Sequence, residues 1–269
     1  MQYRILFGVK EDRRAVIEPI LRETDFSFHM APLDKADLGS FDAVIPLTLP
    51  DQAILRRRRA AGEVFCSLLP DAATENLCHD KKALNLALIR AGFDRYIPNM
   101  LDSLPEDPAR YPVVVKKFRD EWGKNTRIIR TGDALPGFDA ENEFLQECVP
   151  GADEYATHLL VSNGKICFEQ TVRYTMGAEL LVKGKYAHAK DAKWQNETPD
   201  LQLFQQMLDA IGFADGICCI DYRRIDGVVQ LFEINPRFGA SLARKVDSLL
   251  QAYLNALGHN RHTAQMLAG

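Results

Sequence analysis

The order of apolar runs along the chain is the feature that most restricts its fold. Runs at residues 3–9, 41–47 and 64–67 have the length and composition of strands, and segments with helical spacing lie between them. Strands that alternate with helices predict a parallel sheet. The sequence therefore begins with a small α/β unit, which we expect to end near residue 75.

The rest of the chain is richer in strands than in helices. Helices are expected at residues 80–91, where Gly92 is a natural helix end, and at residues 201–211 and 241–257. Ser162-Asn163-Gly164-Lys165 is a hairpin turn signal. The expected strands lie at residues 112–118, 126–130, 143–149, 155–161, 166–173, 216–224 and 228–235.

This order of elements predicts three domains of mixed α/β and α+β class. We place them at residues 1–75, 76–150 and 151–269. A chain of 269 residues with 46% hydrophobic and 26% charged residues can bury a core of ordinary size. Clefts between such domains are favoured places for ligands.

Charge and hydropathy exclude several kinds of partner. The chain has 33 Lys and Arg against 37 Asp and Glu, a net charge of −4, whereas nucleic-acid binding needs a basic surface to neutralise phosphates. No apolar run reaches the ~18 residues of a membrane span, and the N-terminus is too charged for a signal peptide. We expect a cytoplasmic protein that binds neither nucleic acid nor membrane, with a homodimer left open.

The six cysteines do not form a metal-binding or disulfide pattern. Their spacing is irregular and no C-x-x-C pair occurs. A zinc site would need clustered Cys and His ligands. We therefore expect six reduced thiols.

The segment around Glu233 carries the strongest chemical signal. Residues two apart on a strand share a face, so Glu233 and Asn235 point the same way and offer oxygen donors that suit Mg²⁺. Arg237 follows, where it can meet a phosphate. Taken alone, the E-x-N pattern is more typical of an edge strand with solvated polar residues. Asp221 adds a carboxylate within an apolar strand, which is costly unless the group is paired or binds a metal.

The hairpin between these strands decides whether Asp221 can reach the same metal. A three-residue loop at residues 225–227 would place Asp221 diagonal to Glu233, whereas a two-residue turn would put the two carboxylates on opposite faces. A glycine at the third loop position suits the three-residue type. We therefore predict that loop, with Gly227 at positive φ and with Asp221, Glu233 and Asn235 on one face.

A lysine and a loop in the second domain have the form of a phosphate site. Lys116 ends the apolar run at residues 112–115, and a glycine-containing loop follows at residues 121–126. Such a loop between strands can close over phosphates. Lys116 by itself equally fits a solvated lysine at the end of a strand.

Five segments, in this order, resemble the ATP-grasp superfamily and most closely its carbamoyl-phosphate-synthetase-like carboxylate–amine ligases. The segments are Asp80-Lys81, residues 112–116, residues 146–154, Asp221 and residues 233–237. The resemblance covers roughly residues 75–245, and the E-x-N-P-R segment is its most specific part. It implies an ATP-grasp fold with an N-terminal pre-ATP-grasp unit, a lid unit and a catalytic unit.

The resemblance assigns nucleotide-binding roles to matched positions. Lys81 and Lys116 would contact the phosphates of ATP, and the backbone at Glu147, Cys148 and Val149 would bind adenine. Glu154 would hold the ribose hydroxyls, which fits because a carboxylate can accept two hydrogen bonds from a diol.

The resemblance also assigns the metal and the transferred group. Asp221, Glu233 and Asn235 would hold two Mg²⁺ ions, for which Mn²⁺ is an alternative. Arg237 and Lys116 would stabilise the transferred phosphoryl group and the acyl phosphate.

The chain departs from its relatives at two places. The loop after Lys116 is bulky and charged where the family is usually rich in Gly and Ser. Cys219 stands where some relatives have an arginine two residues before the metal-binding acid. Arg173 is a candidate to supply that positive charge, with a surface salt bridge as the alternative.

The implied function is an ATP-dependent carboxylate–amine ligase that forms an acyl phosphate and releases ADP and phosphate. Its partners would be a small-molecule carboxylate and an amine, which the sequence does not identify. Two alternatives stay open: an ATP-grasp kinase that phosphorylates a small molecule, and a nucleotide-binding module without catalysis.

Overall fold

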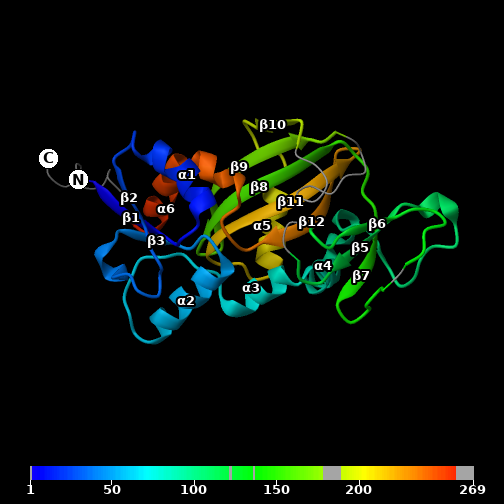
Figure 1. Cartoon of the computed structure of the whole chain (residues 1–269), viewed down its shortest axis with the longest axis horizontal. Coiled ribbons are helices and arrows are strands. Elements are labelled where there is room, and N and C mark those ends of the chain that lie inside the picture. Colours follow the sequence, from blue (N-terminus) through cyan, green and yellow to red (C-terminus); the bar gives the residue numbers. More distant parts are fainter. Residues whose placement is uncertain (1, 121–122, 136, 178–188, 259–269) are drawn as a thin grey trace.

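The structure is a computed structural model that describes residues 2–120, 123–135, 137–177 and 189–258. Three sheets follow one another along the long axis of the molecule (Figure 1). Glu121 and Trp122 of the expected phosphate loop lie outside the described residues. None of the described helices is long and apolar enough to cross a membrane. All six cysteines are free, as the sequence predicts.

The N-terminal sheet is parallel, which confirms the expectation from the alternating pattern. Its strand order is β2 (Phe26–Met30), β1 (Tyr3–Phe7) and β3 (Ala43–Ile45). Helices α1 (Glu11–Leu21) and α2 (Leu49–Ala60) follow β1 and β3. The start of α2 is fixed by a capping box in which Thr48 and Asp51 satisfy each other's backbone N–H groups.

Two details of this sheet differ from the sequence expectation. β2 was not expected, although its sequence alternates apolar and polar residues, and all five of its residues are half-buried. The segment 64–67 is not a strand, although the N–H of Val44 donates to the carbonyl of Cys66 at 2.8 Å. A single bond of this kind leaves the segment beside the sheet without joining it.

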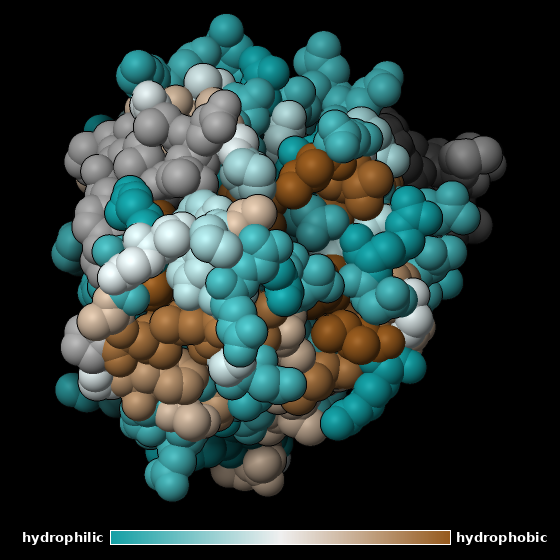
Figure 2. Space-filling model, turned by 90° about the vertical axis from the view of Figure 1, so that its right-hand side faces the viewer, coloured by the Kyte–Doolittle hydropathy of each residue, from teal (hydrophilic) through white to brown (hydrophobic). Residues whose placement is uncertain are grey.

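The four-stranded sheet is antiparallel, with the order β4 (Met100–Leu101), β7 (Glu143–Glu147), β5 (Val113–Lys117) and β6 (Arg127–Ile129). It forms the end of the molecule that faces the viewer in Figure 2, where apolar areas lie between hydrophilic ones. Its core is small, built on Val113, Val115, Ile129 and Leu145. A small core with apolar residues at its margin fits a unit of only four short strands.

Two helices, α3 (Ala72–His79) and α4 (Lys81–Leu88), precede the four-stranded sheet. Asp80 caps α4 by accepting a hydrogen bond from the N–H of Ala83 at 2.9 Å. This cap places Lys81 in the first turn of α4. The backbone N–H of Lys81 donates to the carbonyl of Phe118 at 2.8 Å, which ties α4 to the end of β5.

The five-stranded sheet has the order β10 (Asp191–Trp194), β9 (Lys165–Thr175), β8 (Asp153–Ser162), β11 (Gly216–Ile225) and β12 (Val228–Asn235). Ser162 pairs with Lys165, and the two residues between them have positive φ, so the predicted hairpin turn is confirmed. The short strand β10 lies between β9 and α5, where no strand was expected.

Residues of the five-stranded sheet alternate between a packed face and an open face. Cys218, Ile220 and Tyr222 of β11 pack with α4 and with α5 (Leu201–Ala210). The residues between them, such as Cys219 and Asp221, point to the other side.

The hydrophobic core links the two ends of the chain. Helix α6 (Val246–Ala256) follows a 3₁₀ turn at Ser241–Lys245 and packs with α1 and the N-terminal sheet. The hydroxyl of Tyr253 in α6 accepts a hydrogen bond from the N–H of Leu68 at 2.7 Å. The domain boundaries at residues 75 and 150 stay predictions.

The hairpin between β11 and β12 corrects the predicted loop. Ile225 pairs with Val228, so the turn has two residues, and Asp226 and Gly227 have φ of 50° and 81°. The three-residue loop was therefore wrong, although the positive φ of Gly227 is confirmed. A β-bulge then shifts the register: Tyr222 pairs with Leu231, but Asp221 pairs with Glu233.

The bulge explains why the two-residue turn does not separate the carboxylates. Phe232 is the extra residue on β12, and each inserted residue reverses the alternation of faces beyond it. Asp221 and Glu233 therefore lie directly opposite each other, closer than the diagonal arrangement that the sequence predicted.

Candidate active site

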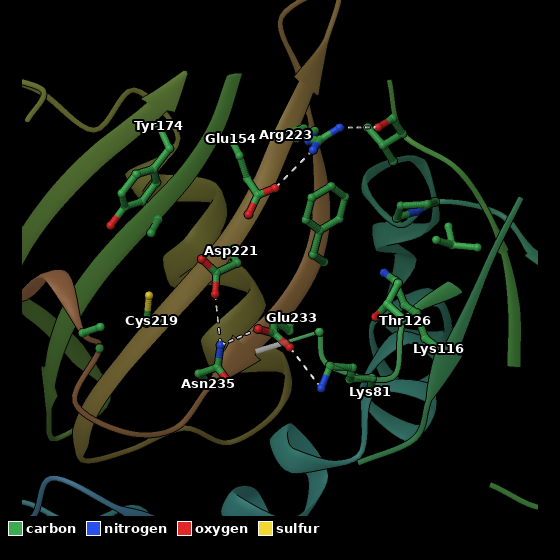
Figure 3. Close-up of a pocket in the computed structure, with 18 of the residues that line it drawn as sticks. Lys81, Lys116, Thr126, Glu154, Tyr174, Cys219, Asp221, Arg223, Glu233 and Asn235 are labelled. Carbon is green, nitrogen blue, oxygen red and sulfur yellow. Dashed lines mark hydrogen bonds and ion pairs between the residues drawn. The ribbon is translucent and has the colours of Figure 1, made fainter. Parts of the chain in front are cut away.

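A cavity of about 380 Å³ lies between the four-stranded and five-stranded sheets (Figure 3). The open face of β8, β11 and β12 forms one wall, and β5 and the segment after β7 form the other. The residues predicted from sequence that line it are Lys81, Lys116, Glu147, Cys148, Val149, Glu154, Asp221, Glu233, Asn235 and Arg237. Residues from five separate segments of the chain thus meet in one space.

Asp221, Glu233 and Asn235 form one cluster on the cavity wall. The side-chain Nδ2 of Asn235 donates to Asp221 Oδ2 at 3.0 Å and to Glu233 Oε1 at 2.8 Å (Figure 3). This arrangement confirms the prediction that the three side chains share a face.

Lys81 neutralises part of this cluster. Its Nζ lies 3.1 Å from Glu233 Oε2 and donates to the backbone carbonyl of Asp120 at 2.6 Å. Burial raises the pKa of Glu233, but the charge of Lys81, hydrogen bonds from Asn235 and Lys81, and the charge of Lys116 outweigh it and hold the pKa at about 2. The carboxylate of Glu233 is therefore ionised at neutral pH.

Lys116 points into the cavity from the end of β5. Its Nζ donates to Gln146 Oε1 at 2.8 Å and lies 5.0 Å from the centre of the Phe232 ring. The Lys116 side chain is half-buried, and its burial lowers the pKa of the ammonium to about 8. The negative charge of Glu233 raises this pKa but does not offset the effect of burial. This ammonium is poorly solvated, so an anionic group in the cavity would stabilise it.

The segment after β7 is held by contacts on both sides. The N–H of Glu147 donates to Asn99 O at 2.9 Å, and its carboxylate accepts hydrogen bonds from Asn99 and from Arg110. The N–H of Cys148 donates to Pro112 O at 3.3 Å. These bonds fix the backbone that forms the cavity edge next to Lys116.

Sequence reasoning missed several residues that line the cavity. They include His158, Tyr174, Arg223, Phe232 and Ser241, whereas Gly123 and Thr126 of the lining belong to the expected phosphate loop. Arg223 was within reach of the alternation rule, because it lies two residues beyond Asp221 on β11. Phe232 was not, since an unbulged strand would have turned it away from Glu233.

His158 and Ser241 form a polar pair in the lining of the cavity. His158 is buried on β8, and its Nε2 lies 2.7 Å from Ser241 Oγ. Gly239 approaches the imidazole so closely that a Cβ there would lie 2.3 Å from its Cε1. A glycine at position 239 therefore makes room for the ring.

Arg173 does not line the cavity. It lies on β9, and its Nη1 is 3.7 Å from Asp153 Oδ2, with both side chains more than a third exposed. The structure thus places it in the surface salt bridge that was the alternative. Cys219 has His158 and Asn235 as its cross-strand neighbours.

The chemistry of the donor set fits a hard divalent cation. Two carboxylates and one amide lie on one face, and a half-turn of the Asn235 amide would present Oδ1 in place of Nδ2. Among the residues that the structure describes, no three His, Cys, Asp or Glu side chains form a metal cluster, so a cation here would rely on the amide and on ligand oxygens as well. The neighbouring Lys81, Lys116 and Arg237 suit a polyphosphate.

Comparisons with known proteins establish the fold. No protein-family profile and no curated protein sequence matches the chain. Among solved structures, D-alanine–D-alanine ligase from Bacillus anthracis complexed with ATP is similar at 14% identity and a TM-score of 0.59, over 96% of this chain and 99% of that one. L-amino acid ligase from Bacillus licheniformis is similar at 14% identity and a TM-score of 0.62, over 95% and 74%.

A third similar structure is N5-carboxyaminoimidazole synthase from Aspergillus clavatus in complex with ADP and 5-aminoimidazole ribonucleotide. It shares 14% identity at a TM-score of 0.59, over 94% of this chain and 77% of that one. The chain therefore has the ATP-grasp fold, as the ordered motifs predicted.

Proposed function

We propose that the protein is an ATP-dependent carboxylate–amine ligase that acts through an acyl phosphate. The observation that carries the proposal is the single cavity in which the Asp221–Glu233–Asn235 cluster faces the ammonium groups of Lys81 and Lys116. The ATP-grasp fold supports it, since the similar structures include ligases, one of which is complexed with ATP.

ATP would lie along the cavity with its base at residues 147–149 and its phosphates at Lys81 and Lys116. Glu154 would accept hydrogen bonds from the ribose hydroxyls. Asp221, Glu233 and Asn235 would hold two Mg²⁺ ions, or Mn²⁺ in their place. Bound cations of this kind neutralise the charge that develops on a transferring phosphoryl group.

The reaction would proceed in two steps. An oxygen of the substrate carboxylate attacks the γ-phosphorus of ATP. The bond between the γ-phosphorus and the oxygen that bridges it to the β-phosphate breaks, and ADP leaves. The amine nitrogen then attacks the acyl carbon, and the carbon–oxygen bond to phosphate breaks. Arg237 and Lys116 would hold charge on the transferred group, and no protein nucleophile is required.

The test is an ADP-release screen with MgATP over a panel of carboxylates, each with and without a panel of amines. The ligase predicts ADP release that needs a carboxylate, and product formation that needs an amine. Hydroxylamine in place of the amine should give a hydroxamate, because it reacts with acyl phosphates. Glu233→Gln should abolish ADP release, whereas Glu23→Gln, on the exposed surface of the N-terminal unit, should not change it.

Other outcomes identify the alternatives. ADP release that depends on a small molecule but yields no hydroxamate would indicate a kinase. ATP binding without ADP release across the panel would indicate a nucleotide-binding module. Absence of both binding and turnover would refute the proposal.

A further inference from the structure

A buried arginine lies on the same strand as Asp221 and reaches the edge of the cavity. Asp221, Glu233 and Asn235, the group proposed above to bind Mg²⁺, are called the metal cluster below. Arg223 on β11 is only 3% exposed. Its Nη1 donates to the backbone carbonyl of Val149 at 2.9 Å, and its Nη2 lies 3.3 Å from Glu154 Oε2 (Figure 3). One side chain therefore holds both the segment after β7 and the carboxylate at the start of β8.

Arg223 and Asp221 belong to the same face of β11. They are two residues apart, a spacing of roughly 6.6 Å on a strand. The strand thus fixes the distance between the metal cluster at Asp221 and the groups that Arg223 holds. A ligand that spans the cavity must match this distance.

The geometry suits an arginine and no other side chain. A guanidinium presents several N–H donors in a rigid fork, so it can bind a carbonyl and a carboxylate at once, whereas a lysine ammonium has no such fork. The guanidinium also lies 5.7 Å from the centre of the Phe232 ring, which faces Lys116 as well. Phe232 thereby supports the arginine within the cavity wall.

A buried ion pair is weak evidence for a stabilising role. Removing two charges from water is costly, and a hydrophobic replacement of similar volume is often as stable. Glu154 is itself only 5% exposed, and it lines the cavity together with Val149. The pair is therefore better explained by what it holds in place than by the stability it adds.

We propose that Arg223 is a positioning residue for the nucleoside half of the ligand. It orients Glu154 toward the ribose hydroxyls and holds the backbone of Val149 at the base, at a set distance from the metal cluster. The inference rests on the proposed function, but it concerns the nucleoside contacts alone.

Calorimetric titration with two Mg²⁺-loaded probes tests the inference. ADP requires both the nucleoside and the phosphate contacts, whereas inorganic tripolyphosphate requires only the phosphate contacts. Arg223→Met should weaken ADP binding about tenfold or more, because it releases both the carboxylate and the backbone that would contact the nucleoside. Tripolyphosphate binding should stay within about twofold of wild type, a change of roughly 0.4 kcal/mol.

A third probe isolates the ribose contact. Wild type should prefer ADP over 2′,3′-dideoxy-ADP, and Arg223→Met should lose this preference, as should Glu154→Gln. The double variant should lose no more than either single variant, because both act on the same carboxylate. Arg223→Lys keeps the buried charge, so it tests the same loss of preference if Arg223→Met does not fold.

Arg224→Met is the matched control. Arg224 is the next residue on β11, and it forms an ion pair with Asp200 on the packed side of the sheet, away from the cavity. Its replacement removes one arginine and one ion pair but should leave the ratio of ADP to tripolyphosphate affinity unchanged.

The results separate this inference from the proposed function. If wild type binds neither ADP nor tripolyphosphate, the proposed function fails. If wild type binds both, then unchanged ADP affinity in folded Arg223→Met and Arg223→Lys overturns the inference. An equal loss for ADP and tripolyphosphate also overturns it, because that result indicates a general disturbance of the cavity.

Discussion

Replacing Lys116 by Met should change how the free energy of unfolding depends on pH. Burial lowers the pKa of Lys116 from 10.5 to about 8 in the folded protein. Between these two values the unfolded chain binds more protons than the folded one, so the stability of wild type rises with pH across this range. A difference of about 2.5 pH units corresponds to a rise on the order of 3 kcal/mol.

Met has no proton to lose, so this rise should be absent from Lys116→Met. Wild type should therefore gain on the order of 3 kcal/mol relative to the variant between pH 7.5 and 10.5. Glu233 stays ionised throughout this range, so its altered surroundings shift the variant's stability by a constant amount. Comparing the two proteins at each pH cancels the titration of all other groups.

Urea unfolding followed by tryptophan fluorescence at four pH values from 7.5 to 10.5 measures the difference. Lys165→Met is the matched control, because Lys165 is exposed at the start of β9. The free energy of unfolding of Lys165→Met should change with pH as that of wild type does. If the free energy of unfolding of Lys116→Met also follows the wild-type pH dependence, Lys116 is not a poorly solvated ammonium and the reasoning is wrong.

Two further predictions concern the cavity. The pKa of Glu233 lies at about 2, below its ordinary 4.5, so the stability from its ionised form is complete above pH 4.5 and is lost as the pH falls toward 2. In acid unfolding experiments, Glu233→Gln should not show this loss of stability between pH 4.5 and 2. A variant whose stability falls with pH as that of wild type does would contradict the low pKa of Glu233. Gly239→Ala should lower stability by about 1–3 kcal/mol, because its Cβ would meet the His158 ring. A thermal-denaturation midpoint equal to wild type would show that the ring moves freely.

Much of the site follows from strand periodicity alone. Alternation along β12 places Glu233 and Asn235 on one face, and the apolar run before Lys116 places that lysine at the end of a strand. Both statements need only local sequence, and the structure agrees with them. The meeting of these strands across a cavity did not follow from periodicity, and it was inferred from the ordered resemblance to a known fold.

Two features escaped prediction for different reasons. β2 pairs with β1, and its alternation of apolar and polar residues was a local signal for this strand that the prediction overlooked. Arg173 had a plausible charge, but its strand directs it to Asp153 and away from Cys219. The partner that decides the place of Arg173 therefore lies elsewhere in the chain.

The bulge at Phe232 shows how two local signals can be combined. Asp226-Gly227 is a strong signal for a two-residue turn, and regular pairing beyond such a turn puts Asp221 and Glu233 on opposite faces. A shared cation requires them on the same face. These two conditions are compatible only if one extra residue interrupts one of the strands, so together they require a bulge between the turn and the carboxylates. The predicted three-residue loop satisfies only the second condition, whereas the protein satisfies both with the extra residue in β12. The bulge also turns the Phe232 ring into the cavity, where the ring contacts the side chains of Lys116 and Arg223. The same inserted residue therefore aligns the two carboxylates and forms the part of the cavity wall that both basic side chains contact.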